Sequence, residues 1–247
     1  MSAHGPVRVQ ARAWGPGAEQ ALDGVADLIG LHDDPSGLVP RHRIVAELAR
    51  RFSDLRLPRT NGVFEALLPA ICEQKVTGIE ARRAYRSIVV AHGEPAPGPA
   101  DVRLPPEPRT LAGLPYYAFH PFGLERRRAE VIRRTAVVAA RLEDPAPPVA
   151  ERYRRMEAIP GIGPWTVAEV GRIAFGDPDA VSVGDFHLPN LVAWLLAGEP
   201  RADDERMLEL LEPYRGQRGR VQRLLEASGQ TPPRRGPRYA PRSIERI

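Results

Sequence analysis

One acidic residue stands in a setting suited to chemistry. Asp185 follows Gly184 in an irregular stretch ahead of a new helix, and a carboxylate on such a loop can face a cleft. There it could stabilise a developing positive charge and orient a water molecule. The alternative is that Asp185 only caps the helix that follows, by accepting hydrogen bonds from its first backbone N–H groups.

A glycine-rich turn, Ile-Pro-Gly-Ile-Gly-Pro-Trp-Thr at 159–166, lies between two helical patterns upstream of Asp185. Its glycines allow a tight turn with positive φ and leave the N–H groups of Gly161 and Gly163 uncovered. The proline after them suits a first helical turn, whose free amides and dipole attract a phosphate without reading a base. The side chains of Ile159 and Ile162 are expected to pack in the core and so anchor the turn. A bare Gly-x-Gly can be a plain turn, but the longer pattern resembles the helix–hairpin–helix element of DNA-binding proteins.

Turn and carboxylate together resemble one enzyme superfamily. A hairpin, then Trp165, then Gly-Asp at 184–185 is the pattern of the helix–hairpin–helix/Gly-Pro-Asp DNA glycosylases, which the chain resembles from about 59 to 241. Within the superfamily it resembles the bacterial 3-methyladenine DNA glycosylase II group, the alkylpurine glycosylases. The segments that carry this resemblance are 68–78, 122–130, 159–166 and 183–190.

The resemblance implies DNA base-excision repair by hydrolysis of the N-glycosidic bond of a flipped alkylated purine, such as 3-methyladenine. Asp185 would be the catalytic carboxylate, because this bond breaks through an oxocarbenium-like sugar. Trp165 would stack on the base, since an indole face attracts a base made cationic by alkylation. Tyr117, Gln74 and His187 are the other candidates for the base pocket, and core packing is the alternative for Trp165 and Tyr117.

Contacts to DNA are expected at the hairpin and at the start of a basic helix. An apolar side chain must also fill the hole left by the flipped base, and Phe122 or Leu124 matches the family's loop for this wedge. Either could instead be a helix staple. The residues expected to contact DNA are Gly161, Ile162, Gly163, Thr166, Phe122, Leu124, Arg127 and Arg128.

Two residue types occur only once in the chain. Cys72, in an apolar run, excludes an intramolecular disulfide and any cysteine-ligated zinc or iron–sulfur cluster. No cofactor and no side-chain metal site are expected, although a monovalent cation on the hairpin backbone would fit the family. In related strand-cutting enzymes a lysine stands where this chain has Trp165, whereas Lys75 belongs to a different motif. We therefore expect base excision without lyase activity.

Helices must position these residues. Outside one predicted strand at 7–14, apolar residues recur at helical spacing between Pro- and Gly-rich breaks. The Pro-rich stretch 94–108 is expected to cross the surface and could separate two lobes. The sequence predicts a mainly α, two-lobed helix–hairpin–helix glycosylase fold with at most a short N-terminal strand remnant. Residues 1–57 would pack on the core of the glycosylase region, 58–247, which ends in a basic tail. Predicted helices include 17–31, 41–52, 62–76, 77–92, 124–142, 149–158, 203–211 and 218–227.

Composition favours an anionic partner. Of the 247 residues 43% are hydrophobic, the net charge is +4, and the sequence pI is near 9.6. Nine arginines against two glutamates from Tyr214 onward and the arginines of 126–134 form two basic faces. No membrane span or secretory signal is evident, so we expect a cytoplasmic, nucleoid-associated monomer bound to damaged double-stranded DNA.

Two other functions remain open at this point. The base could be deaminated, hypoxanthine or uracil, because neutral bases need only more help in leaving. The chain could also be a non-catalytic helix–hairpin–helix DNA-binding protein, in which Asp185 is only a helix cap.

Overall fold

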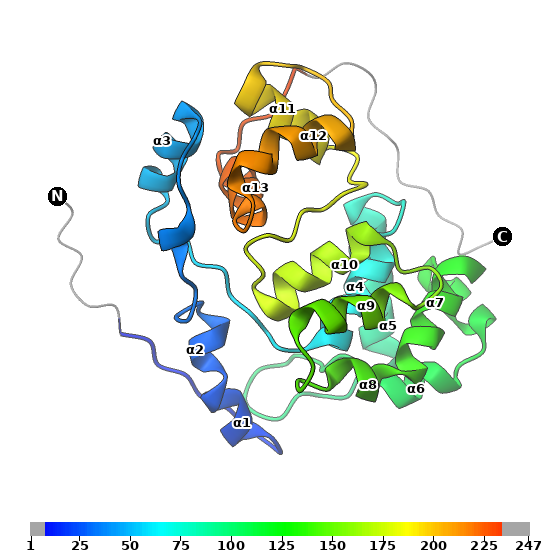
Figure 1. The fold of residues 1–247 in the computed structure, drawn as a ribbon. Helices are drawn as coiled ribbons and strands as arrows, with labels where there is room; N and C mark the ends of the chain where they lie inside the picture. Colours follow the sequence, from blue (N-terminus) through cyan, green and yellow to red (C-terminus); the bar gives the residue numbers. More distant parts are fainter. Residues whose placement is uncertain (1–7, 234–247) are drawn as a thin grey trace.

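The computed structural model describes residues 8–233, and within them the chain is helical, without a strand, around two hydrophobic cores (Figure 1). The mainly α, two-lobed fold is thus confirmed. No helix in this range is long and apolar enough to span a membrane.

The larger core is centred on α4 (Val63–Glu73), which packs against α5, α7, α8 and α10. Most of α4 is buried on every side, as expected for a helix that is apolar all round. The α5 helix starts at the predicted capping box, in which Thr77 and Glu80 bond to each other's backbone N–H. The other elements of this lobe are α5 (Gly78–His92), α6 (Pro108–Gly113), η2 (Tyr116–Phe122), α7 (Arg126–Val137), α8 (Ala139–Glu143), α9 (Val149–Glu157), α10 (Pro164–Val170) and the π-helical turn η3 (Gly171–Phe175).

The smaller core joins the two ends of the described chain. Val45 and Leu48 lie three residues apart on α3 (Arg43–Arg51) and pack against α13 (Arg218–Ala227), beside which Figure 1 shows α3. The remaining elements of this lobe are α11 (Leu188–Ala197), α12 (Asp204–Leu211) and η4 (Glu212–Tyr214). Residues 38–55 therefore supply part of the second core.

The remaining N-terminal elements, α1 (Ala18–Asp23), α2 (Val25–Leu28) and η1 (Pro35–Gly37), run along both lobes. Asp27 pairs with Arg59, just ahead of α4, at 2.7 Å. Asp33 pairs with Arg220 of α13, and both side chains are almost fully buried. These ion pairs tie the N-terminal segment to each lobe.

Several expectations need correction. Residues 8–14 form no strand, and no neighbouring strand among the described residues could pair with them; Val7 lies outside that range. The predicted helix 17–31 is split at Gly24, and 124–142 is split at Val138. The Pro-rich stretch is exposed, as expected. It joins α5 to α6, which both pack in the larger core, and therefore does not separate the two lobes.

Candidate active site

A pocket of about 370 Å³ opens where four segments meet: the α4–α5 junction, the start of α7, the glycine-rich hairpin and the loop ahead of α11. Most of the residues singled out in the sequence are found here. The lining residues are Gln74, Lys75, Glu125, Arg127, Arg128, Gly161, Ile162, Gly163, Trp165, Thr166 and Gly184.

The hairpin between α9 and α10 depends on one glycine. Gly161 has φ +100°, and a Cβ there would lie 2.2 Å from Cγ2 of Val131. Gly163 has φ −110° with open space around it, so only the first glycine is required by the backbone. Ile159 and Ile162 are buried in the larger core, as predicted.

Gln74, which caps the C-terminal end of α4, links this hairpin to α4 by hydrogen bonds. Its Nε2 donates hydrogen bonds of 3.0 Å to the Gly161 carbonyl and to Oγ1 of Thr166. Thr166 is 2% exposed, so its side chain serves as a hydrogen-bond acceptor for Gln74. It is not exposed for the DNA contact that was predicted. Gln74 does line the pocket, but its amide nitrogen is already committed to the hairpin.

The hairpin backbone offers two N–H groups to an anion. The carbonyls of Ile159, Pro160 and Gly161 already accept hydrogen bonds, that of Pro160 from the Arg134 guanidinium at 3.2 Å. The N–H groups of Gly161 and Gly163 donate to no acceptor within residues 8–233. A monovalent cation on the hairpin carbonyls stays a prediction, and the mechanism below uses none.

Asp185 is held by one carboxylate oxygen only. Its Oδ1 accepts hydrogen bonds from the backbone N–H groups of His187 (2.7 Å) and Leu188 (2.8 Å) at the start of α11. Oδ2 accepts none within the described part of the chain. Asp185 is therefore a helix cap, and the same contacts fix its carboxylate while leaving one oxygen for chemistry.

Trp165 and the loop that carries Asp185 lie against each other. Gly184 has φ +92°, and a Cβ on it would lie 3.8 Å from that of Trp165. Trp165 is half-buried, and both residues line the pocket. The indole and the carboxylate-bearing loop thus share one site.

Arg127 and Arg128 have different roles. Arg127 is exposed at the pocket and remains a candidate for a phosphate contact. Arg128 is 5% exposed and donates to the carbonyls of Cys72 and Gly123 and to Glu125, so the prediction that it binds DNA is corrected. It stabilises the end of α4 instead.

Glu125 was not recognised in the sequence, where it is one of many surface-type acids. Burial alone would raise its pKa, but the hydrogen bond and charge of Arg128 outweigh that, and the pKa of Glu125 lies below its usual value. The pocket therefore holds an ionised carboxylate here and no carboxylic acid ready to donate a proton.

Lys75 lies in the same pocket as Trp165, although the sequence placed the two in separate motifs. It is exposed and has φ +57°, a conformation that costs a non-glycine residue energy. The single lysine therefore lines the candidate site, although it belongs to a different motif from Trp165.

The predicted wedge residues are not exposed. Leu124 is 1% exposed in the larger core, and Phe122 packs its ring edge against His92, with centroids 5.6 Å apart. The burial of Leu124 corrects its prediction as a wedge, whereas Phe122 is only partly buried and its role as a wedge stays a prediction. The helix-staple alternative fits Leu124 better.

Two further pocket candidates lie outside it. Tyr117 is 66% exposed and packs edge-on against Tyr116, so it is neither in the core nor among the lining residues. His187 is exposed, with its ring against that of Phe186 at a centroid distance of 4.9 Å. Phe186 itself, 76% exposed beside Asp185, was missed because nothing in its local sequence marks exposure.

The described part of the C-terminal basic face is neutralised by ion pairs. Each arginine between 214 and 223 pairs with a carboxylate, as given by the pairs Arg215–Glu212, Arg218–Asp179, Arg220–Asp33 and Arg223–Glu226. The other arginines of that face lie outside the described residues. The arginines of 214–223 therefore form ion pairs within the fold.

Cys72 behaves as predicted for a small buried residue. It is fully buried, and burial raises the pKa of its thiol to about 12. Within residues 8–233 no three His, Cys, Asp or Glu side chains are grouped so as to hold a metal ion.

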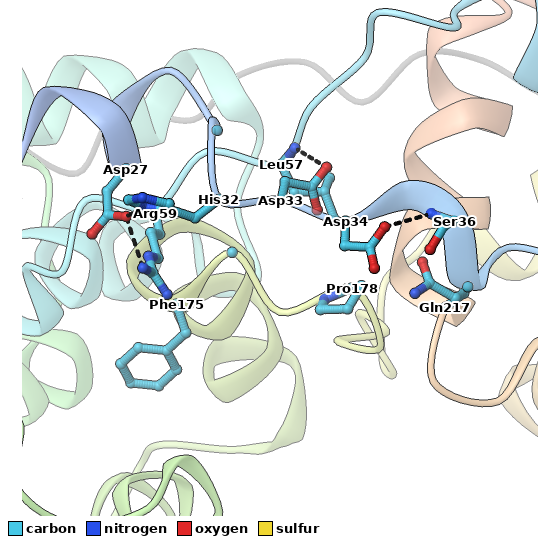
Figure 2. A pocket seen from close by; sticks show the side chains of 13 residues that line it. Asp27, His32, Asp33, Asp34, Ser36, Leu57, Arg59, Phe175, Pro178 and Gln217 are labelled. Carbon is cyan, nitrogen blue, oxygen red and sulfur yellow. Dashed lines mark hydrogen bonds and ion pairs between the residues drawn. The ribbon is translucent and has the colours of Figure 1, made fainter.

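A larger hollow of about 440 Å³ lies beside the N-terminal segment (Figure 2), and its polar side chains already have partners. Asp27 bonds to Arg59, His32 and Asn61, and Asp33 bonds to the Leu57 N–H and to Arg220. We interpret this hollow as part of the packing interface between the N-terminal segment and the lobes.

Comparison with known proteins relates this fold to solved structures. No protein-family model matches the sequence, and no curated protein matches it either. A 3-methyladenine DNA glycosylase from Archaeoglobus fulgidus superposes with a TM-score of 0.70 at 21% identity, covering 86% of this chain and 75% of that one.

Two further structures extend the comparison. The Clostridium acetobutylicum 8-oxoguanine glycosylase/lyase bound to double-stranded DNA gives a TM-score of 0.68 at 15% identity, over 84% of this chain and 73% of that one. A Schizosaccharomyces pombe 3-methyladenine DNA glycosylase in complex with abasic DNA gives 0.60 at 18% identity, over 86% and 100%. The chain therefore has the fold of the helix–hairpin–helix DNA glycosylases, as the sequence predicted.

Proposed function

We propose that this protein is a DNA glycosylase of base-excision repair that hydrolyses the N-glycosidic bond of a flipped, alkylated purine such as 3-methyladenine. The observation that carries the proposal is Asp185, whose carboxylate is fixed through Oδ1 beside a pocket that contains Trp165 and the hairpin. The fold shared with 3-methyladenine glycosylases supports it.

Double-stranded DNA would be held from the hairpin side. The unbonded N–H groups of Gly161 and Gly163 suit phosphate oxygens, and the exposed Arg127 adds a positive charge at the same pocket. These contacts read no base, so they would position the duplex while the damaged base enters the pocket.

Asp185 would act on the sugar. As the base departs, positive charge develops on the anomeric carbon and ring oxygen, and the free Oδ2 would stabilise it. The two backbone N–H groups on Oδ1 keep the carboxylate from turning away, and the same carboxylate can orient the attacking water.

The pocket chemistry favours a leaving base that is already cationic. Glu125 is ion-paired with Arg128 and its pKa is lowered, so it is not a general acid for a neutral base. Trp165 offers an indole face, which attracts a cation more strongly than a neutral ring. Both features support alkylated purines over hypoxanthine or uracil.

Strand cleavage is not part of the proposal. A lyase step needs an amine to attack the sugar, and the residue on the hairpin is Trp165. Lys75 lines the pocket and is the only lysine, so trapping with borohydride on abasic DNA is a direct check. We expect no covalent complex, and a trapped complex that Lys75→Arg abolishes would contradict this part of the proposal.

The substrate is tested by release of free base from duplexes that contain methylated purines, hypoxanthine or uracil, with alkali added afterwards to reveal abasic sites. We expect release from methylated DNA and strand breaks only after alkali. Release confined to hypoxanthine or uracil would change the substrate, whereas binding with no release from any duplex would favour the non-catalytic alternative.

A further inference from the structure

A buried polar network surrounds Ser182, three residues ahead of Asp185, and no part of the mechanism above uses it. Ser182 is 2% exposed, and its hydroxyl donates a 2.5 Å hydrogen bond to Oε1 of Glu169 on α10. Gln222 of α13, also 2% exposed, donates from Nε2 to the same hydroxyl at 3.2 Å. Its Oε1 accepts the Ser182 N–H at 3.2 Å.

The two acceptor and donor side chains around Ser182 have further partners. Glu169 pairs through its other oxygen with Arg172 of the π-helical turn η3, which follows α10. Gln222 donates to Oε1 of Glu226 at 2.8 Å. Each carboxylate or amide of the network thus has partners, which is the condition under which a buried polar network fixes one geometry.

The network connects the two lobes. Glu169 belongs to α10 of the larger core, and Gln222 belongs to α13 of the smaller one. The loop that carries Ser182 runs from η3 to α11, between these two helices in Figure 1. Ser182 therefore forms hydrogen bonds to both lobes.

Short backbone links join Ser182 to the carboxylate. The Asp185 N–H donates to the Ser182 carbonyl at 3.2 Å, and the Gly184 N–H donates to Oδ1 of Asp204 on α12 at 3.0 Å. Asp185 then accepts from the start of α11. A shift of Ser182 would move the first of these contacts and with it the carboxylate.

We propose that Ser182, held by Glu169 of one lobe and Gln222 of the other, is a positioning residue that fixes the Asp185 carboxylate beside the pocket that Gly184 lines. This inference rests on the proposed function. Because catalysis depends steeply on geometry, a displacement of about 1 Å can cost about a hundredfold in rate.

The test compares Ser182→Ala with a matched serine control. Ser228→Ala removes a hydroxyl at the C-terminal end of α13 that donates to the Leu225 carbonyl and accepts from the Gln230 N–H, both far along the chain from Asp185. Single-turnover base release from methylated DNA is measured together with affinity for an abasic-site duplex and the unfolding midpoint. We expect release to fall about tenfold to a hundredfold for Ser182→Ala with unchanged DNA affinity, and no loss for Ser228→Ala.

A second readout does not depend on activity. Amide hydrogen exchange at His187 and Leu188 reports the hydrogen bonds to Asp185 Oδ1 and should accelerate in Ser182→Ala but not in Ser228→Ala. Ser182→Thr, which keeps the hydroxyl, should restore both rates. Gln222→Leu keeps most of the volume, removes the α13 side of the network, and should reproduce the defect if Ser182→Ala is poorly folded.

The outcomes separate the two claims. An inactive wild-type protein would contradict the proposed function. An active wild-type protein with Ser182→Ala equally fast, and with unchanged exchange at His187 and Leu188, would overturn the positioning role. A loss of stability and DNA affinity in parallel with activity would also overturn it, because that is the signature of a purely structural network.

Discussion

At the scale of single residues, the account depends on how Asp185 uses its two oxygens. Oδ1 caps α11 by accepting two hydrogen bonds, whereas Oδ2 accepts none from the described residues. The capping alternative raised from the sequence is therefore compatible with the catalytic role. Asp185 and Trp165 could be singled out because their signal is local in the sequence. Burial of Arg128 could not, since it depends on the Cys72 carbonyl, 56 positions away.

Trp165→Ala should slow release of a cationic alkylated base by about fivefold to thirtyfold, because a desolvated cation–π contact contributes about 1–2 kcal/mol. Release of a neutral base, wherever it is detectable, should change less. The measurement is the single-turnover rate on each duplex. Trp14→Ala, which removes an exposed tryptophan outside the pocket, is the control. Equal losses on charged and neutral bases would argue against stacking of a cation.

At the scale of elements, the hairpin is held by tertiary contacts that its own sequence does not contain. The glycine pattern predicts the turn, but Gln74 comes from the junction after α4 and Val131 from α7. The same limitation explains the wedge residues. Phe122 and Leu124 match a family pattern, and only the packing of η2 and α7 reveals that Leu124 is buried and Phe122 is partly buried.

Gly161→Ala should lower the free energy of unfolding by about 1–3 kcal/mol, because Ala is strained at φ +100° and its Cβ would meet Val131. Gly163→Ala should be tolerated, since its φ of −110° and open surroundings suit alanine. Urea unfolding of both variants makes the comparison. Equal destabilisation by the two substitutions would contradict this account of the hairpin.

At the scale of the whole molecule, the N-terminal segment bridges the lobes through carboxylates. The helical class and most helix positions could be predicted from the sequence because apolar periodicity and capping are local signals. The second core could not, because Val45 and Leu48 pair with residues near the other end of the chain. Neither could the ion pairs that neutralise the arginines of 214–223.

The bridge predicts a pH dependence of stability. Hydrogen bonds from Arg59, His32 and Asn61 hold the pKa of Asp27 well below its usual value. A depressed pKa in the folded state gives stability that is present above the unfolded pKa of about 3.9 and is lost as pH falls through the folded value. The free energy of unfolding should therefore drop on acidification below about pH 4.

Asp27→Asn should flatten this acid limb, because the titrating group is gone, and should lower stability at neutral pH. Asp23→Asn, at the exposed end of α1, is the control. The measurement is urea unfolding across the acid range. An unchanged acid limb in Asp27→Asn would show that other carboxylates dominate the dependence.

The most direct test of the central claim is single-turnover base release from methylated duplex DNA by Asp185→Asn. Asparagine keeps an oxygen that can accept from His187 and Leu188, so the cap and the fold should survive while the negative charge is lost. We predict that release falls about a hundredfold or more with DNA affinity unchanged. Release at the wild-type rate would contradict the assignment of Asp185 as the catalytic carboxylate.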